Sequence, residues 1–125
     1  MTIKYLTIKS PKEFKLAPDN CKKSHTNSLT ILVGATPQKY FYNNINGKNL
    51  ENFCRVGITV SKQVSKKSII RNLIKRRIRN SLKSIIGIYG KNHYDYIIIA
   101  KKNIVEESFQ NIYNQIKYSI KKLNQ

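Results

Sequence analysis

The sequence predicts an α+β fold, a two-layer α/β sandwich in which helices pack on a small, mostly antiparallel sheet. Apolar residues recur at helical spacing in two long segments and as alternating or short continuous runs in others, and the two kinds of segment are interleaved along the chain. The chain has 125 residues, of which 40% are hydrophobic, so it suits one folded domain with its own core. We therefore treat residues 1–125 as a single domain and expect any disorder at residues 1–9 and 121–125.

The first predicted element is a short helix over residues 10–18, where Ser10 is a candidate N-cap and Pro18 limits the helix to about two turns. Residues 28–36 are rich in β-branched side chains, which favours a strand. A polar, Asn-rich loop follows, and its Asn46-Gly47 pair is a turn signal.

Four more elements follow in the second half of the chain. Residues 53–61 alternate apolar and polar side chains, which predicts a half-buried strand. The period then changes to about 3.6, which predicts a helix over 65–86 that Gly87 ends. Residues 94–102 are apolar on both faces and predict a central strand, and residues 105–123 predict an amphipathic helix. The predicted order is α-β-β-β-α-β-α.

The charge balance points to a polyanionic partner. The chain carries 24 Lys and Arg against 6 acids, a formal net charge of +18, which attracts nucleic acid or an anionic membrane surface. Lysine content alone is a weak signal, because a biased coding composition also enriches Lys, Ile and Asn. Arginine is more informative, since four of the five arginines lie in one nine-residue window from Arg71 to Arg79.

Several classes of protein are excluded or disfavoured. No apolar run approaches the roughly 20 residues that a membrane-spanning helix needs, and the N-terminus lacks the apolar stretch of a secretory signal. We therefore expect a cytoplasmic protein without a membrane partner. Cys21 and Cys54 form no CxxC motif, and neither His25 nor His93 stands at a metal-ligand spacing from them, so we expect two idle thiols.

The helix predicted over 65–86 separates charge from apolar surface. On a helical wheel its apolar residues share one arc and would seat the helix on the sheet, which leaves the cations facing outward. The guanidinium fork of Arg can grip a phosphate through two parallel hydrogen bonds and can stack on a base. The plainer alternative is a solvated basic face with no fixed partner. The outward arc holds Arg71, Asn72, Lys75, Arg76, Arg79 and Lys83.

Three blocks of the sequence, residues 55–62, 66–79 and 95–102, resemble the protein subunit of bacterial ribonuclease P in order and spacing. The resemblance implies a left-handed β-α-β crossover through the Arg-rich helix. It also implies a catalytic RNA, with magnesium ions bound mainly by that RNA and none held directly by the protein. The implied partners are ribonuclease P RNA and precursor tRNA, and no stable homo-oligomer is required.

The resemblance also assigns site residues. It places Phe14 and Arg55 in a cleft that holds the single-stranded 5′ leader of precursor tRNA. The chain departs from the family pattern at Leu73, where the third signature position is usually Arg, and at Pro18 and Val33, where the family has cleft aromatics. One phosphate contact is therefore missing or supplied by Arg77, and leader stacking is expected to be weaker. The implied RNA-binding residues are Lys62, Lys66, Lys67, Arg71, Asn72, Lys75, Arg76, Arg77 and Arg79.

The acids do not suggest catalysis by the protein. Asp95 is isolated on its predicted strand, Glu106 and Glu107 stand at a predicted helix start, and no pair of acids or His beside an acid is evident. We therefore expect no catalytic residue in the protein. The expected function is that of an accessory subunit that assists endonucleolytic removal of the 5′ leader. The alternatives are a ribosomal or other structural RNA-binding protein and, less favoured, a DNA-binding protein with the Arg helix in a major groove.

Overall fold

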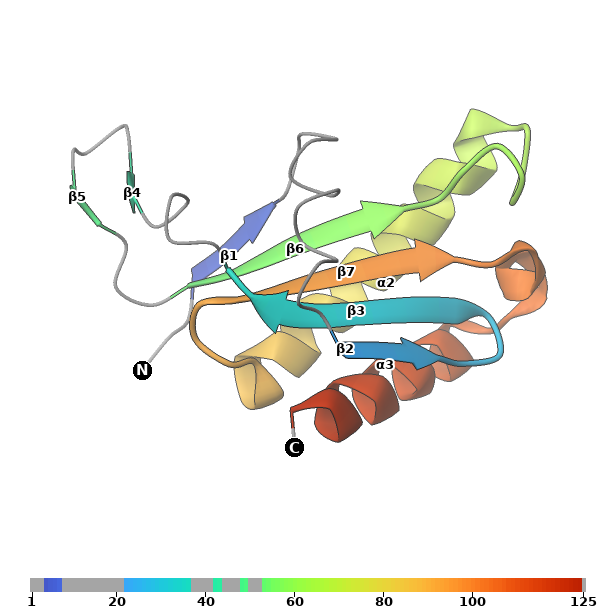
Figure 1. The fold of residues 1–125 in the computed structure, drawn as a ribbon. Coiled ribbons are helices and arrows are strands. Elements are labelled where there is room, and N and C mark those ends of the chain that lie inside the picture. Colours follow the sequence, from blue (N-terminus) through green and yellow to red (C-terminus); the bar gives the residue numbers. More distant parts are fainter. Residues whose placement is uncertain (1–3, 8–21, 37–41, 44–47, 50–52, 125) are drawn as a thin grey trace.

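A computed structural model of the chain describes residues 4–7, 22–36, 42–43, 48–49 and 53–124 (Figure 1). The helix predicted over 10–18 and the turn predicted at Asn46-Gly47 lie outside these residues. The elements are β1 (Lys4–Thr7), β2 (Lys22–His25), β3 (Leu29–Ala35), β4 (Tyr42–Asn43), β5 (Lys48–Asn49), β6 (Phe53–Thr59), α2 (Ser68–Tyr89), β7 (Tyr94–Ala100), the 3-10 helix η3 (Lys102–Glu106) and α3 (Phe109–Leu123).

Five strands form one mixed sheet in the order β1-β6-β7-β3-β2, and β4 pairs with β5 in a separate ribbon. β7 occupies the centre, as its continuous apolar run predicted. β1-β6 and β6-β7 are parallel, whereas β7-β3 and β3-β2 are antiparallel, so the antiparallel share is smaller than predicted. β1 lies within residues 1–9, and the last residues of α3 lie within 121–125, the two terminal segments named in the sequence analysis.

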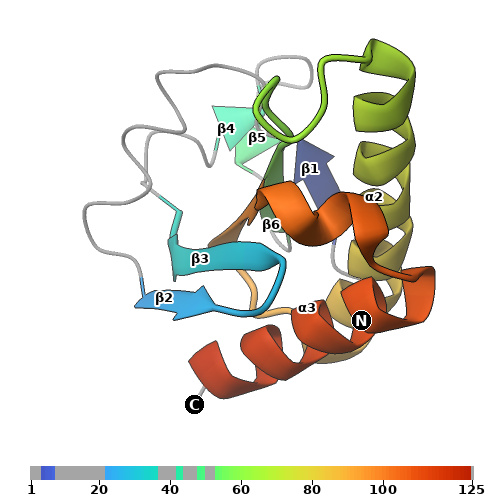
Figure 2. The ribbon, with the colours of Figure 1, turned by 90° about the vertical axis from the view of Figure 1, so that its right-hand side faces the viewer.

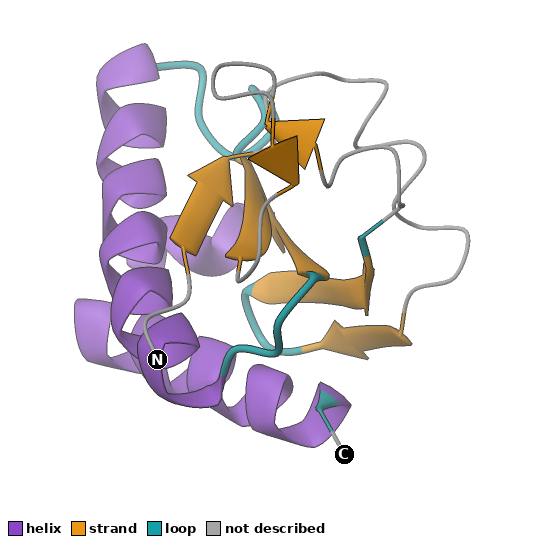
Figure 3. Cartoon of the chain, turned by 90° about the vertical axis from the view of Figure 1, so that its left-hand side faces the viewer, coloured by secondary structure: helices purple, strands orange, loops and turns teal. Residues whose placement is uncertain are grey.

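The connection from β6 through α2 to β7 is left-handed. In Figure 1 both strands point to the right, β7 lies below β6, and α2 lies behind the sheet. Such crossovers are right-handed in about 98% of cases. The exception is the one that the family resemblance implied. Figures 2 and 3 show α2 and α3 on the same side of the sheet, which makes the helices and the sheet two layers.

The core lies between this helical layer and the sheet. In the register Val33, Tyr96 and Val56 stand beside one another on three neighbouring strands, and all three belong to the core. The alternation predicted for β6 is confirmed on this face, where Cys54 and Val56 belong to the core. The prediction of a half-buried strand is wrong for residues 53–57, which are buried on both faces of the sheet. The core positions predicted on α2 are also confirmed, apart from Ile70, which is half-buried. The buried residues of α2 are Ile74, Ile78, Ser81, Leu82, Ile85 and Ile86.

Helix α2 is longer than predicted. Gly87 lies within the helix and does not end it, and the helix runs to Tyr89. Gly90 is the C-cap, and its backbone N–H donates to the carbonyl oxygen of Ile86 at 2.9 Å. A Cβ on Gly90 would stand 2.6 Å from that same oxygen, whereas a Cβ on Gly87 would meet nothing within 4 Å. The helix therefore ends where Gly90 approaches Ile86 closely, and not at Gly87, the first glycine of this segment.

Helix α3 begins later than predicted. Ser108 is its N-cap, and the Ser108 hydroxyl accepts a hydrogen bond from the backbone N–H of Asn111 at 3.1 Å. Glu106 falls in η3, and the first turn of α3 contains no acid. The prediction that Glu106 and Glu107 complement the α3 dipole is therefore wrong. Glu107 instead accepts hydrogen bonds from the side chains of Gln115 and Asn27.

Gln115 ties α3 to the turn between β2 and β3. Its Oε1 accepts hydrogen bonds from the Thr26 hydroxyl at 2.7 Å and from the Ser28 backbone and hydroxyl at 3.0 Å. Its Nε2 donates to Glu107 at 3.0 Å. Both the oxygen and the nitrogen of the Gln115 amide thus have hydrogen-bond partners. Gln115 therefore fixes the edge of the sheet against α3, although the sequence alone suggests an ordinary polar surface residue.

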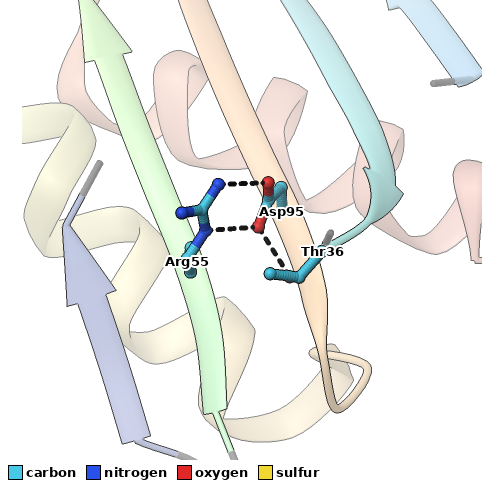
Figure 4. Close-up of polar contacts among 3 residues, drawn as sticks. All are labelled: Thr36, Arg55 and Asp95. Atoms are coloured by element: carbon cyan, nitrogen blue, oxygen red, sulfur yellow. Dashed lines mark hydrogen bonds and ion pairs between the residues drawn. The ribbon is translucent and has the colours of Figure 1, made fainter. Parts of the chain in front are cut away.

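Arg55 and Asp95 form a buried ion pair on the face of the sheet opposite to the helices (Figure 4). Arg55 Nε donates to Asp95 Oδ1 at 2.9 Å and Nη2 donates to Oδ2 at 2.7 Å. The hydroxyl of Thr36, just after β3, donates to Oδ1 at 2.7 Å. The expectation that Asp95 is isolated is wrong, because the parallel register places it directly beside Arg55. Together with Thr36, the pair links β6 and β7 to the end of β3.

The ion pair generates a stability prediction. Asp95→Asn leaves the Arg55 charge buried without its counter-charge, which is expected to lower the free energy of unfolding by about 3–5 kcal/mol. The double variant Arg55→Met with Asp95→Leu is expected to recover most of that loss, because no charge stays buried. Urea unfolding monitored by circular dichroism measures both. Glu106→Gln, on an exposed acid, is the control and should change stability by less than about 0.5 kcal/mol. A loss for Asp95→Asn no larger than the control's contradicts the pair's role.

The two glycines of α2 generate a second, paired prediction. Gly87→Ala is expected to raise the free energy of unfolding by about 0.5–1 kcal/mol, because Ala has the higher helix propensity and its Cβ meets open space. Gly90→Ala is expected to lower it by about 1–3 kcal/mol, because its Cβ collides with the backbone of Ile86. Thermal unfolding of the two variants should shift in opposite directions. Shifts of the same sign contradict the observed helix end.

Candidate nucleic-acid interface

The residues predicted to bind RNA are brought together on α2 and on the loop that precedes it. Lys62, Lys66 and Lys67 are exposed on the loop, and none of the predicted set is buried. Lys83 was placed on the same arc by the helical wheel without being assigned to the site, and it is exposed one turn beyond Arg79. On α2, Asn72, Arg76 and Arg79 are exposed, whereas Arg71, Lys75 and Arg77 are half-buried. These loop and helix residues, with Lys83, are named the α2 basic face.

The N-terminal end of α2 adds to the positive potential of this face. Its N-cap, Lys67, makes no side-chain capping bond, and its first turn contains no acid. The first N–H groups of the helix and the positive end of the macrodipole therefore lie among lysines with no carboxylate to offset them. A helix end of this kind attracts phosphate groups.

Arg71 also organises the loop before the helix. Its Nη1 donates to the carbonyl oxygens of Ser65 at 2.9 Å and Lys66 at 3.0 Å. The hydroxyl of Ser65 in turn accepts from the backbone N–H of Lys67 at 3.2 Å. The sequence suggested only a phosphate contact for Arg71. The structure shows that this side chain also holds the loop lysines in position.

The Leu73 departure lies close to a cation that can compensate for it. Leu73 and Arg77 are four residues apart on α2, so they stand on the same side of the helix one turn apart. Both are half-buried. That Arg77 supplies the contact expected at position 73 stays a prediction.

Arg55, assigned to the leader cleft, and Val33, matched to the strand aromatic of that cleft, lie on opposite faces of the sheet. Phe14 lies outside the described residues. Val33 belongs to the core under the helices, whereas Arg55 is on the opposite face of the sheet. Val33 and Arg55 therefore cannot line the same cleft, and the strand position on the side of Arg55 is Leu32. The alternation of side chains along β3 could have predicted that Val33 faces the core, because residues 29, 31 and 33 share one face of the strand and belong to the core.

The described residues offer little for protein-based catalysis. They contain no cluster of three or more His, Cys, Asp or Glu that could hold a metal ion. Asp95 has both oxygens engaged by Arg55 and Thr36. Burial raises the pKa of the Cys54 thiol to about 11, and this thiol lies 2.8 Å from the carbonyl oxygen of Lys91. Cys54 is thus a buried, protonated thiol, as predicted, while Cys21 lies outside the described residues.

The comparisons with known proteins agree on one family. The ribonuclease P family model matches residues 3–124. The ribonuclease P protein component of a Thermoanaerobacter species is 32% identical over 122 residues, which cover 98% of this chain and 92% of that protein. That of Streptococcus thermophilus is 35% identical over 74 residues, which cover 59% of this chain and 63% of that protein.

Solved structures share the fold. The structure of the Staphylococcus aureus ribonuclease P protein superposes with a TM-score of 0.71 at 21% identity and covers 95% of this chain and 97% of that one. The match covers β6, α2 and β7, the elements that carry the α2 basic face and the left-handed crossover. The chain therefore belongs to the ribonuclease P protein family, the accessory protein subunits of the endoribonuclease that removes the 5′ leader from precursor tRNA.

Proposed function

We propose that this chain binds ribonuclease P RNA and the 5′ leader of precursor tRNA and thereby assists the magnesium-dependent cut that the RNA makes. The observation that carries the proposal is the α2 basic face: a rigid helix whose apolar side is buried in the core and whose cations all reach solvent. The alternative of a ribosomal or other structural RNA-binding protein explains the charge but not the family match.

The α2 basic face suits a folded RNA backbone. Exposed residues on one side of a helix recur with a rise of about 5 Å per turn, so the cations of α2 form a regularly spaced row. Arg76 and Arg79 each present a planar guanidinium that can bind a phosphate through two hydrogen bonds. Asn72, exposed between them and the helix start, can donate to a sugar hydroxyl or to a base edge. We assign the catalytic RNA to this face.

Magnesium is assigned mainly to the RNA. The side chains of the described residues do not fit a protein-held Mg²⁺ site, because that ion prefers carboxylate oxygens and the buried carboxylate of Asp95 is paired with Arg55. The protein acts by charge instead. Its cations offset the repulsion between catalytic RNA and precursor tRNA, so fewer magnesium ions are needed to hold the two polyanions together.

For the leader we propose the sheet face opposite to the helices, on which Arg55 lies. Two nitrogens of Arg55 are committed to Asp95 and both side chains are buried, so the proposed role of Arg55 is to fix the strands that form this face. Phe14 keeps its assignment as a stacking residue. With Leu32 in place of a strand aromatic on this face, one base–ring stack is lost, which is consistent with a weaker grip on the leader.

The cellular setting follows from the proposed substrates. We place the protein in the cytoplasm with ribonuclease P RNA and precursor tRNA, and the proposal requires no homo-oligomer. Neither described helix combines the length and apolar composition that a membrane crossing requires.

Reconstitution tests the proposal. The cognate ribonuclease P RNA and a precursor tRNA are incubated at low magnesium, with and without this protein. The protein is expected to raise the cleavage rate at least about ten-fold, because its cations replace part of the magnesium requirement. The measurement is the rate of leader release under single turnover. Equal rates with and without the protein, at every magnesium concentration, contradict an accessory role.

The second test concerns the α2 basic face. Arg76→Gln with Arg79→Gln removes two exposed charges, so the log–log salt slope of binding to ribonuclease P RNA is expected to become less steep by about 1.4–1.8. Lys23→Gln with Lys102→Gln removes the same total charge from exposed positions outside the α2 basic face and serves as the matched control. Fluorescence anisotropy across a salt series measures both. Equal changes in slope for the two variants mean that net charge, and not α2, governs binding.

A further inference from the structure

A second surface that combines lysines with an exposed aromatic ring lies on α3. Four residues of the C-terminal half of the helix and one from the turn before line an open cavity of about 440 Å³. The side chain of Tyr118 is exposed, at 61%. The side of α3 that faces the core is separate and consists of its isoleucines, Ser119 and Leu123. The lining residues, named the α3 surface, are Asn114, Lys117, Tyr118, Lys121 and Lys122.

The lysines of this surface are arranged around aromatic rings. Lys122 Nζ lies 5.9 Å from the ring centroid of Tyr118. Lys117 and Lys121 lie over the ring of Tyr89, with Nζ 6.0 Å and 5.4 Å from its centroid. Tyr89 is the last residue of α2, and Asn124 Nδ2 donates to its carbonyl oxygen, so the C-terminal ends of the two helices are fixed together. Cations are thereby held beside rings in a defined arrangement.

Helix stability alone does not account for this composition. Lys121 and Lys122 in the last turn complement the macrodipole. Lys117 lies before that turn, and its i,i+4 pairing with Lys121 places like charges side by side, which is unfavourable. The sequence has no acid after Glu107, so no carboxylate side chain on α3 offsets the three lysines. An exposed ring flanked by cations without acids matches the sites that bind single-stranded nucleic acid, in which bases stack on rings and lysines hold phosphates.

The α3 surface is distinct from the α2 basic face. Along α2, Tyr89 is 18 residues, about 27 Å, from Arg71 in the first turn of the α2 basic face, and 6 residues, about 9 Å, from Lys83 at its far end. Figure 2 shows α3 crossing near one end of α2, away from the end that follows β6 and carries the loop lysines. One short RNA strand lying on the first turns of α2 does not reach both.

We propose that the α3 surface binds a single-stranded RNA segment. One base of the segment stacks on Tyr118, and Lys117, Lys121 and Lys122 bind the phosphates of the segment. This contact is additional to the one proposed for α2 and stands or fails independently of a role in cleavage. Tyr118 is a binding residue in this proposal, and Tyr89 positions two of the lysines.

The experiment measures binding of a fluorescent ten-nucleotide oligouridylate to the full chain carrying Arg76→Gln and Arg79→Gln, so that α2 contributes less. In that background Tyr118→Leu is expected to weaken binding about 5-fold to 150-fold, the range for loss of one stacked base. Phe109→Leu removes another exposed aromatic of α3 outside the surface and is the matched control. Lys121→Gln with Lys122→Gln is expected to reduce the salt slope by about 1.4, compared with Lys23→Gln and Lys102→Gln.

The outcomes are decisive in each direction. A larger effect at Tyr118 than at Phe109, together with ultraviolet cross-linking of 4-thiouridine RNA to the segment around Tyr118, supports the proposal. Equal effects of the paired variants overturn it, as does a stronger dependence on Tyr118 for a ten-residue oligoglutamate than for RNA, which identifies an acidic protein partner. Normal cleavage at low magnesium with lost oligouridylate binding leaves the α2 role intact, so failures of the two proposals are distinguishable.

Discussion

Burial of the apolar side of α2 against the sheet is the interaction on which the rest of the molecule depends. Three pairs of like charges, Arg71-Lys75, Lys75-Arg79 and Arg79-Lys83, stand at i,i+4 on this helix, and each costs about 0.2–0.5 kcal/mol. Full burial of one isoleucine contributes about 1.5–3 kcal/mol, and the helix buries several such side chains. The core therefore stabilises a helix whose exposed side is crowded with positive charge. Without that core the same residues would form a weak helix with no fixed array of cations.

The handedness of the crossover decides which face of the sheet the two helices cover. With β7 in its observed place beside β6, a right-handed connection would carry α2 to the face on which Arg55 lies. The left-handed path puts α2 beside α3 over the core-facing row of β6 and β7. Neither of these two helices then covers the face that holds Arg55, Asp95 and Leu32. The left-handed connection thus places the α2 basic face and the sheet face that holds Arg55 on different sides of the molecule.

The sequence predicted the parts of the fold that have strong local patterns. The alternation of β6, the apolar run of β7 and the 3.6-residue period of α2 are properties of single segments, and all three were confirmed. What was missed depends on neighbours distant in the sequence. β2, whose residues Lys22–His25 are mostly polar, is a strand because β3 pairs with it. The end of α2 depends on how closely Gly90 approaches Ile86, which no count of glycines reveals.

The candidate site shows the same division. The α2 basic face was predictable because its residues lie on one helix, and the wheel is a local construction. The match of Val33 to the strand aromatic of the leader cleft came from comparing positions between sequences and did not consider the faces of β3, and Val33 lies in the core under the helices. Arg55 and Asp95 were both noted in the sequence, yet their pairing requires the parallel register of β6 and β7. Contacts between side chains on neighbouring strands depend on how the strands pair, which local sequence patterns do not predict.

Net charge and local arrangement have different consequences for RNA binding. A charge of +18 raises the rate of encounter with any polyanion, but at physiological ionic strength exposed charges are screened over about 8 Å. The first turn of α2, at Arg71, and its last residue, Tyr89, are about 27 Å apart, about three times that length, so the cations at one end of the helix act independently of those at the other. Asp95 adds no free negative charge to the field, because Arg55 pairs with it. The position of each cluster on its helix, and not the total charge, therefore determines where an RNA strand comes to rest.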